Sequence, residues 1–137
     1  MVRQIVHDSI FLQQKSLPAD QSDMDTVRDL KETLAANSDR CVGMAANMIG
    51  VSKTILAAVI KGKILVMINP VIIDSSKQVY TAEEGCLSLT GTRSTERHKV
   101  ITVEFLDEKF KKKKMTLRDF DAQIIQHEID HFSGKLI

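Results

Sequence analysis

The sequence is poor in several residue types, and each shortage narrows what the chain can be. Its 137 residues include no Trp, one Tyr and five Phe, so the core must be built mainly from aliphatic side chains and Met. The two prolines, Pro18 and Pro70, are too sparse to mark a linker, and no repeat or low-complexity block is present. We therefore expect a single domain over residues 1–137, able to bury its own core as a monomer.

The chain also lacks a large net charge and a long hydrophobic run. Its formal net charge is +1, and its one dense basic run is Lys109 with Lys111 to Lys114. Such a run is typically a solvated strand face or turn, with ribosomal RNA contact as the alternative. The longest apolar stretch, Thr54 to Ile60, is far shorter than a membrane span, and no signal-peptide hydrophobic region is present. These features predict a cytoplasmic protein with no specific nucleic-acid or membrane partner.

Cysteine is scarce as well, since Cys41 and Cys86 are the only two. They would suffice for one disulfide, but a chain of this type more often uses Cys for packing, as a ligand or as a nucleophile. The neighbours of each Cys therefore decide its role.

Helical periodicity occurs near both ends of the sequence. Apolar residues at helical spacing predict a helix over 23–36, with Ser22 or Asp23 as its N-cap. A second helix is predicted from residue 120 or 121 to Ser133, with Gly134 as its C-terminal stop.

The middle of the chain is predicted to be mostly β. Runs rich in β-branched residues indicate a hairpin turning at Lys61-Gly62, whose second strand meets a break at Asn69-Pro70, and a further antiparallel pair downstream. The expected strands cover residues 54–60, 63–68, 71–73, 100–106 and 111–117. Strands bracketed by helices without βαβ alternation indicate an α+β domain.

The second predicted helix carries the sequence His127-Glu128-Ile129-Asp130-His131, a His-Glu-x-x-His pattern. Residues four apart share a helix face, so both imidazoles can bind one metal ion while Glu128 reaches the water on that ion. The alternative is that these polar residues simply lie on the solvent-exposed face of a helix and bind no metal.

A metal site of this kind needs a third ligand. Six residues follow His131, too few for the downstream ligand that other enzymes with this pattern use, so we expect the ligand upstream. Cys86, next to Gly85, offers a thiolate suited to zinc or ferrous iron. Taken alone, Cys86 is more typical of a small buried hydrophobe, but beside an incomplete His-Glu-x-x-His pattern the ligand interpretation is favoured.

Three segments resemble motifs of the peptide deformylase family, in the family's order. Glu84-Gly85-Cys86-Leu87-Ser88 and Gln126-His127-Glu128-Ile129-Asp130-His131 match two motifs fully, whereas the segment from Cys41 to Met48 matches Gly-φ-Gly-φ-Ala-Ala-x-Gln with departures. The resemblance implies antiparallel sheets packed around a C-terminal helix that carries the His pattern. It also implies a ferrous enzyme that removes the N-formyl group from the N-terminal formylmethionine of new polypeptides.

The same resemblance assigns roles to individual residues. Cys86, His127 and His131 would be the metal ligands, with Fe²⁺ as the family's ion, although the donor set suits Zn²⁺, Ni²⁺ or Co²⁺ equally. Glu128 would act as general base and then as acid, and the Leu87 N–H would donate to the oxyanion. Cys41 and Cys86 are then not expected to form a disulfide.

The chain departs from the family pattern at Met48, which stands where the motif Gln donates to the oxyanion. A thioether cannot donate, and losing one such donor typically costs about 2.7–4 kcal/mol. Asn47 is either a substitute donor or a turn residue. Cys41 in place of a motif Gly and Thr90 in place of Pro are further departures.

The residues that would bind the substrate are predicted less directly than the metal ligands. Phe120 and Ile124 lie on the helical face of His127 and, with Val42, would form an apolar pocket for a methionine side chain or simply belong to the core. Backbone groups near Gly43 and Leu87 would pair with an extended peptide.

We expect Glu84 to pair with Arg93 or Arg97 as structural support. The partners implied are formylmethionyl peptides, with transient ribosome contact. Two alternatives stay open: a deformylase-like peptide-binding protein with weak or lost catalysis, and a metal amidase for another acyl group.

Overall fold

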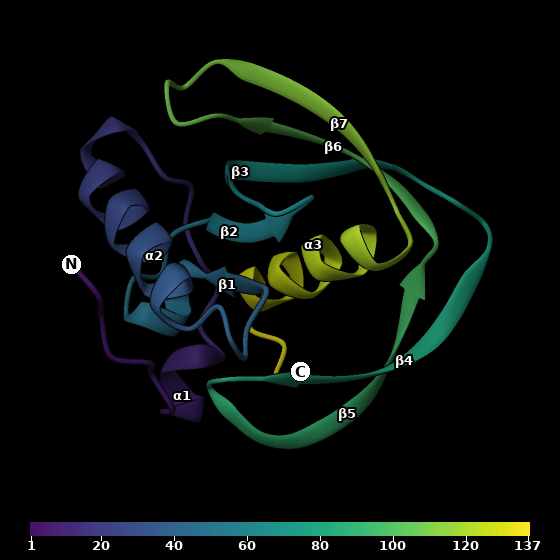
Figure 1. Ribbon diagram of the computed structural model, residues 1–137, viewed down its shortest axis with the longest axis horizontal. Helices are drawn as coiled ribbons and strands as arrows, with labels where there is room; N and C mark the ends of the chain where they lie inside the picture. The colour runs from purple at the N-terminus through teal and green to yellow at the C-terminus, as the bar shows by residue number, and fades with distance from the viewer.

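The computed structural model describes residues 1–137 as two layers of antiparallel strands with helices packed against them (Figure 1). Two short 3-10 helices, η1 and η2, accompany the other elements. In chain order these are α1 Ser9–Leu12, η1 Gln21–Asp23, α2 Met24–Ala36, β1 Gly43–Ala45, η2 Ala46–Ile49, β2 Ile55–Ile60, β3 Lys63–Ser75, β4 Val79–Cys86, β5 Leu89–His98, β6 Val100–Leu106, β7 Lys112–Arg118 and α3 Asp119–Phe132.

A five-stranded sheet in the order β1-β2-β3-β6-β7 separates two hydrophobic cores. Because side chains alternate along a strand, each face of β2 contributes to a different core. Leu56 and Ala58 belong to the core that includes α3, whereas Ile55 and Ala57 belong to the core that includes α2. The sheet is therefore buried on both faces, with one helix on each.

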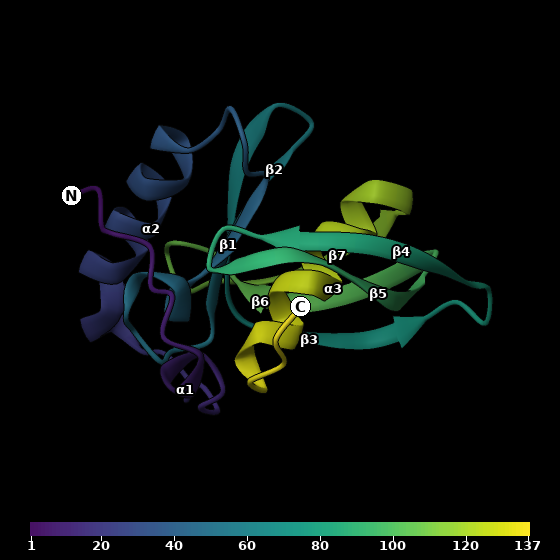
Figure 2. The same cartoon turned by 90° about the horizontal axis from the view of Figure 1, so that it is seen from below.

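The remaining strands, β4 and β5, form a separate antiparallel hairpin on the other side of α3. In Figure 1 α3 lies between this hairpin and the larger sheet, and from below the hairpin and α3 overlap in the view (Figure 2). The expectation of antiparallel sheets around a C-terminal helix in an α+β fold is confirmed. No helix is long and apolar enough to cross a membrane.

Most of the predicted elements are confirmed, including both long helices. The stop at Gly134 is confirmed too: its φ is +85°, and a Cβ there would lie 2.2 Å from the Gln13 carbonyl oxygen. The N-cap of α2 is Asp23, one of the two predicted residues, but its side chain makes no capping hydrogen bond to α2. Asp23 Oδ2 instead accepts from the Asp20 N–H, and Asp20 in turn caps η1 by accepting from the Ser22 N–H.

The predicted break at Asn69-Pro70 is also wrong, since β3 continues through it with a register shift between Ile68 and Val71. Asn69 adopts a φ of 51°, and its side chain accepts from the Ala19 N–H and donates to the Ala19 carbonyl oxygen. These bonds stabilise the bulge, so the strand bends instead of ending.

Candidate metal centre

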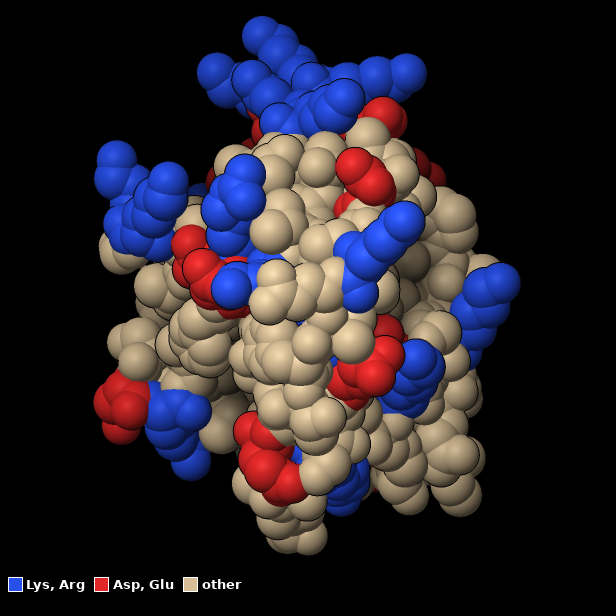
Figure 3. Space-filling model, turned by 90° about the vertical axis from the view of Figure 1, so that its right-hand side faces the viewer, with Lys and Arg blue, Asp and Glu red and all other residues tan.

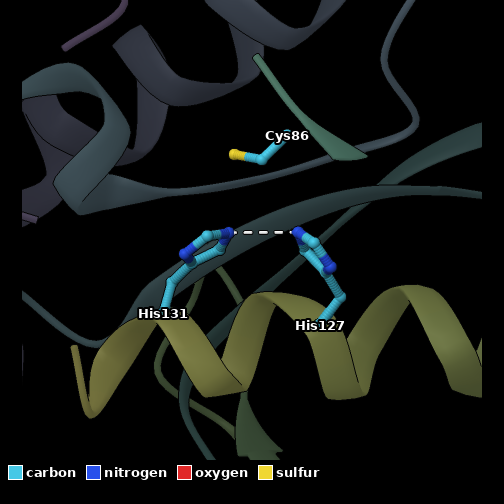
Figure 4. Close-up of side chains that lie close together, drawn as sticks. All are labelled: Cys86, His127 and His131. Atoms are coloured by element: carbon cyan, nitrogen blue, oxygen red, sulfur yellow. Dashed lines mark hydrogen bonds between the residues drawn. The ribbon is translucent and has the colours of Figure 1, made fainter. Parts of the chain in front are cut away.

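The two predicted histidine ligands and Cys86 converge in the structure. His127 and His131 project from one face of α3 toward Cys86, which ends β4 (Figure 4). Their ligand atoms all lie within 4.8 Å of one another, and the two Nε2 atoms are 3.1 Å apart. Two nitrogens on one tetrahedral ion at about 2.0–2.1 Å would lie roughly 3.4 Å apart. The Cys-His-His set therefore fits a single divalent ion.

A buried charge network orients His127. Its Nδ1 lies 2.7 Å from the Glu84 carboxylate, which also accepts two hydrogen bonds from the Arg97 guanidinium at 2.6 and 2.9 Å. A proton on Nδ1 leaves the Nε2 lone pair directed at the cluster. Burial opposes ionisation of Glu84, but the bonds from Arg97 and His127 outweigh it and lower its pKa to about 2. Glu84 is therefore a permanent carboxylate, and its expected partner proves to be Arg97.

Besides the Tyr80 hydroxyl, which donates to Gln123 Oε1 at 3.0 Å, three polar contacts fasten the β4–β5 hairpin to α3 and so place Cys86 opposite the histidines. One is the Glu84–His127 contact, and a second is the Arg97 bond to Asp130 at 2.5 Å. The third is the Gln126 side chain, whose amide bonds both the N–H and the carbonyl oxygen of His98 at 2.8 Å. The hairpin is mostly exposed, so these contacts rather than hydrophobic packing set its position.

The two histidines are affected differently by their surroundings. Burial lowers the pKa of His131 to about 3, which keeps it in the neutral form that binds metals. Burial acts the same way on His127, but its hydrogen bonds with Cys86 and Glu84 outweigh that effect and raise its pKa. Binding an ion at His127 Nε2 therefore displaces a proton.

Glu128 lies beside the cluster as a buried carboxylate. Its Oε1 has no hydrogen-bond partner and lies 3.9 Å from His131 Nε2. Burial raises the pKa of Glu128 to about 7. Gly43 makes room for it, because a Cβ on Gly43 would lie 2.7 Å from Glu128 Oε2 and 2.8 Å from an Ile124 methyl group.

The structure shows what surrounds the residues of the first motif that differ from the family pattern or could compensate for the difference. Met48 is buried, with its Sδ 3.8 Å from Cys86 Sγ. Asn47 does not replace the missing amide donor, because its Nδ2 donates to the His131 carbonyl oxygen. The expectation that the two cysteines stay free is confirmed, and Cys41 donates to the Gly43 carbonyl oxygen at 2.8 Å.

A cavity of about 430 Å³ opens beside the cluster. Val42, Phe120 and Ile124, the candidates for an apolar pocket, line it together with Gly43, and Ile124 is buried whereas Phe120 is 57% exposed. Leu87 lines it as well, and its N–H donates no hydrogen bond within the chain.

Sequence reasoning assigned no role to three polar side chains on the cavity wall, Arg40, Glu83 and Gln123. Gln123 could have been found, because it lies four residues before His127 on the same helix face. Arg40 precedes the first motif, and no pattern pointed to it.

The fold and the site together define a metal-dependent hydrolase: a Cys-His-His cluster with a buried carboxylate whose pKa is near neutral, at the wall of a cavity. The model of the polypeptide deformylase family matches residues 2–137. The chain belongs to the peptide deformylase family.

Individual relatives agree with this assignment. A peptide deformylase from Clostridium beijerinckii is 52% identical over 137 residues, covering 100% of both chains. The structure of a peptide deformylase from Ehrlichia chaffeensis matches with a TM-score of 0.90 at 31% identity, covering 99% of this chain and 86% of that one. One from Legionella pneumophila matches at 0.88 and 33%, covering 99% and 83%. Family, fold and relatives support a deformylase function and neither of the two alternatives raised above.

Proposed function

We propose that the chain hydrolyses the N-formyl group of formylmethionyl polypeptides at the cluster of Cys86, His127 and His131. The observation that carries this proposal is the convergence of those three ligands beside the buried carboxylate of Glu128. One divalent ion held by the three side chains would lower the pKa of a water to about 7 and polarise the formyl oxygen.

Glu128 serves as the proton carrier. It takes a proton from the water that attacks the formyl carbon, and it delivers that proton to the α-amine as the C–N bond breaks and formate leaves. A carboxyl whose pKa is about 7 suits both steps, because it gains and loses a proton readily near neutral pH.

The Leu87 N–H supplies the protein's donor to the oxyanion. This proposal is supported by the position of Leu87, which follows Cys86 and lines the cavity, and by its N–H, which donates no hydrogen bond within the chain. Donors already positioned where charge develops need no reorganisation during the reaction. Met48 occupies the place of a second donor and contributes none.

The peptide lies against β1, which is an edge strand and therefore has unpaired backbone groups. Gly43 and Leu87 are the proposed backbone partners, and Val42, Phe120 and Ile124 hold the methionine side chain in the cavity. A deformylase from Acinetobacter baumannii with 25% sequence identity has been solved with actinonin bound. We expect actinonin to occupy the same cavity here and to compete with substrate.

Several finer features belong to the same proposal. The ion is Fe²⁺, and the chain acts as a single-domain monomer in the cytoplasm. The exposed lysines of the β6–β7 hairpin, Lys109 and Lys111 to Lys114, form a basic patch at the top of Figure 3. A patch of this kind suits transient contact with the phosphates of ribosomal RNA.

A substrate panel tests the reaction class. Anaerobic, iron-loaded protein is given formyl-Met, acetyl-Met and free-amine versions of one tripeptide, and released acid and new amine are both measured. We expect formate from the formyl peptide alone. Acetate release at a comparable rate would contradict a deformylase and indicate a broader amidase.

A further inference from the structure

The Met48 side chain lies next to Cys86, at the edge of the Cys-His-His cluster. It is 1% exposed and lines the cavity, with Sδ 3.8 Å from Cys86 Sγ. The backbone of Met48 is fixed by a hydrogen bond from the Val6 N–H to its carbonyl oxygen at 2.8 Å. The Sδ accepts the Ala45 N–H at 3.5 Å, which uses one of its two lone pairs.

The spacing of the two sulfurs suits a shared ion. Two sulfurs bound to one tetrahedral ion at about 2.3 Å each would lie about 3.8 Å apart, the separation of Cys86 Sγ and Met48 Sδ. The Ala45 N–H fixes the orientation of the thioether, and the second lone pair of Met48 Sδ accepts from the Cys86 thiol. When Cys86 binds a metal as a thiolate it loses that proton, which frees this lone pair of Met48 for the same ion. A buried thioether next to a thiolate and two imidazoles forms a softer donor set than Cys-His-His alone.

We propose that Met48 is a fourth, displaceable ligand of the metal ion, and that the resulting Cys-His-His-Met set favours soft ions such as Cu(I). The proposal rests on the metal site of the proposed function and adds one ligand to it. A neutral thioether is a weak ligand for Fe²⁺ or Zn²⁺, so water and substrate can displace it, whereas Cu(I) retains it. The ion would thus have four protein ligands in the resting protein, and one coordination position would open to water and substrate during turnover.

X-ray absorption at the metal edge tests the ligand directly. All methionines are replaced with selenomethionine, and the protein is loaded with Zn²⁺ or with Cu(I). Met48 is the only one of the six methionines that lines the cavity, so selenium in the first coordination shell identifies it. We expect such a shell with Cu(I), lost in Met48→Leu while the Cys and His shells persist. A first shell of one sulfur and nitrogens without selenium, equal in both proteins, would overturn the proposal and leave Met48 as a packing residue.

A competition titration tests the preference for soft ions. Cu(I) and Zn²⁺ affinities are measured against chromophoric chelators for the wild type and for Met48→Leu, which keeps the apolar volume. We expect the ratio of Cu(I) to Zn²⁺ affinity to fall at least about tenfold in the variant, and an unchanged ratio would contradict the stated preference.

The two proposals fail in different ways. Loss of zinc binding in both Cys86→Ser and His127→Ala, with no selenium shell in the wild type, supports the three-ligand site and overturns only the role of Met48. A selenium shell in protein that never releases formate overturns the catalytic proposal and supports the fourth ligand.

Discussion

Replacing Glu128 allows the loss of stability caused by burying its charged carboxylate to be measured separately from its role in catalysis. Burial raises its pKa from 4.5 to about 7. Because the folded pKa lies above the unfolded one, the folded state holds the proton more tightly, and stability falls as pH rises from about 4.5 through about 7. The shift corresponds to about 3 kcal/mol, of which about 2–3 kcal/mol is lost between pH 5 and pH 8. Glu128→Gln removes this titration.

The assay is urea unfolding of chelator-stripped protein at both pH values, for the wild type and Glu128→Gln. The comparison subtracts the other titrating groups that the two proteins share. We expect the variant to gain about 2–3 kcal/mol relative to the wild type between pH 5 and pH 8. The exposed Glu96 on β5 supplies the control Glu96→Gln, which should gain nothing. Equal pH dependence in the wild type and Glu128→Gln would refute the reasoning.

Three further substitutions test other parts of the site. Met48→Gln restores an amide donor and should raise kcat by about 100- to 1000-fold at equal metal content, and an unchanged kcat would show that the amide adds nothing here. Gly43→Ala places a methyl group against the Glu128 carboxylate, so we expect a fall in kcat and a stability loss of about 1–3 kcal/mol by urea unfolding, and wild-type values would contradict the close approach. Arg97→Met leaves the Glu84 carboxylate buried without its cation and should cost about 3–5 kcal/mol in the same assay, whereas a loss below about 1 kcal/mol would mean that Glu84 is solvated.

The larger sheet and both long helices could be predicted from sequence because each buries one pattern of side chains. On β6, Ile101 and Val103 are buried while Glu104 is exposed, and this period of two is visible in the sequence. The β4–β5 hairpin gives no such signal, because polar contacts to α3 hold it and most of its residues are exposed. The three residues of β1 are too few to show a period.

The histidine ligands could be predicted because His127 and His131 are four residues apart on one helix, and this spacing places both side chains on the same face. Which of Arg93 and Arg97 pairs with Glu84 could not be predicted from the sequence, since Arg93 lies directly opposite Glu84 in the strand register. Arg97 is the observed partner because it also reaches Asp130 on α3, a contact that depends on how the hairpin packs over the helix. The position of Met48 Sδ next to Cys86 likewise depends on η2, which no sequence pattern indicated.

The central claim is that Cys86, His127 and His131 hold an ion that serves a reaction in which Glu128 carries the proton. It is tested most directly by formate release from a formyl-Met peptide, using anaerobic, iron-loaded wild type and Glu128→Gln with iron content measured in the same samples. We expect one iron per chain in both proteins and formate release by the wild type only. Wild-type protein that carries its iron and releases no formate, or a Glu128→Gln variant as active as the wild type, would contradict the claim.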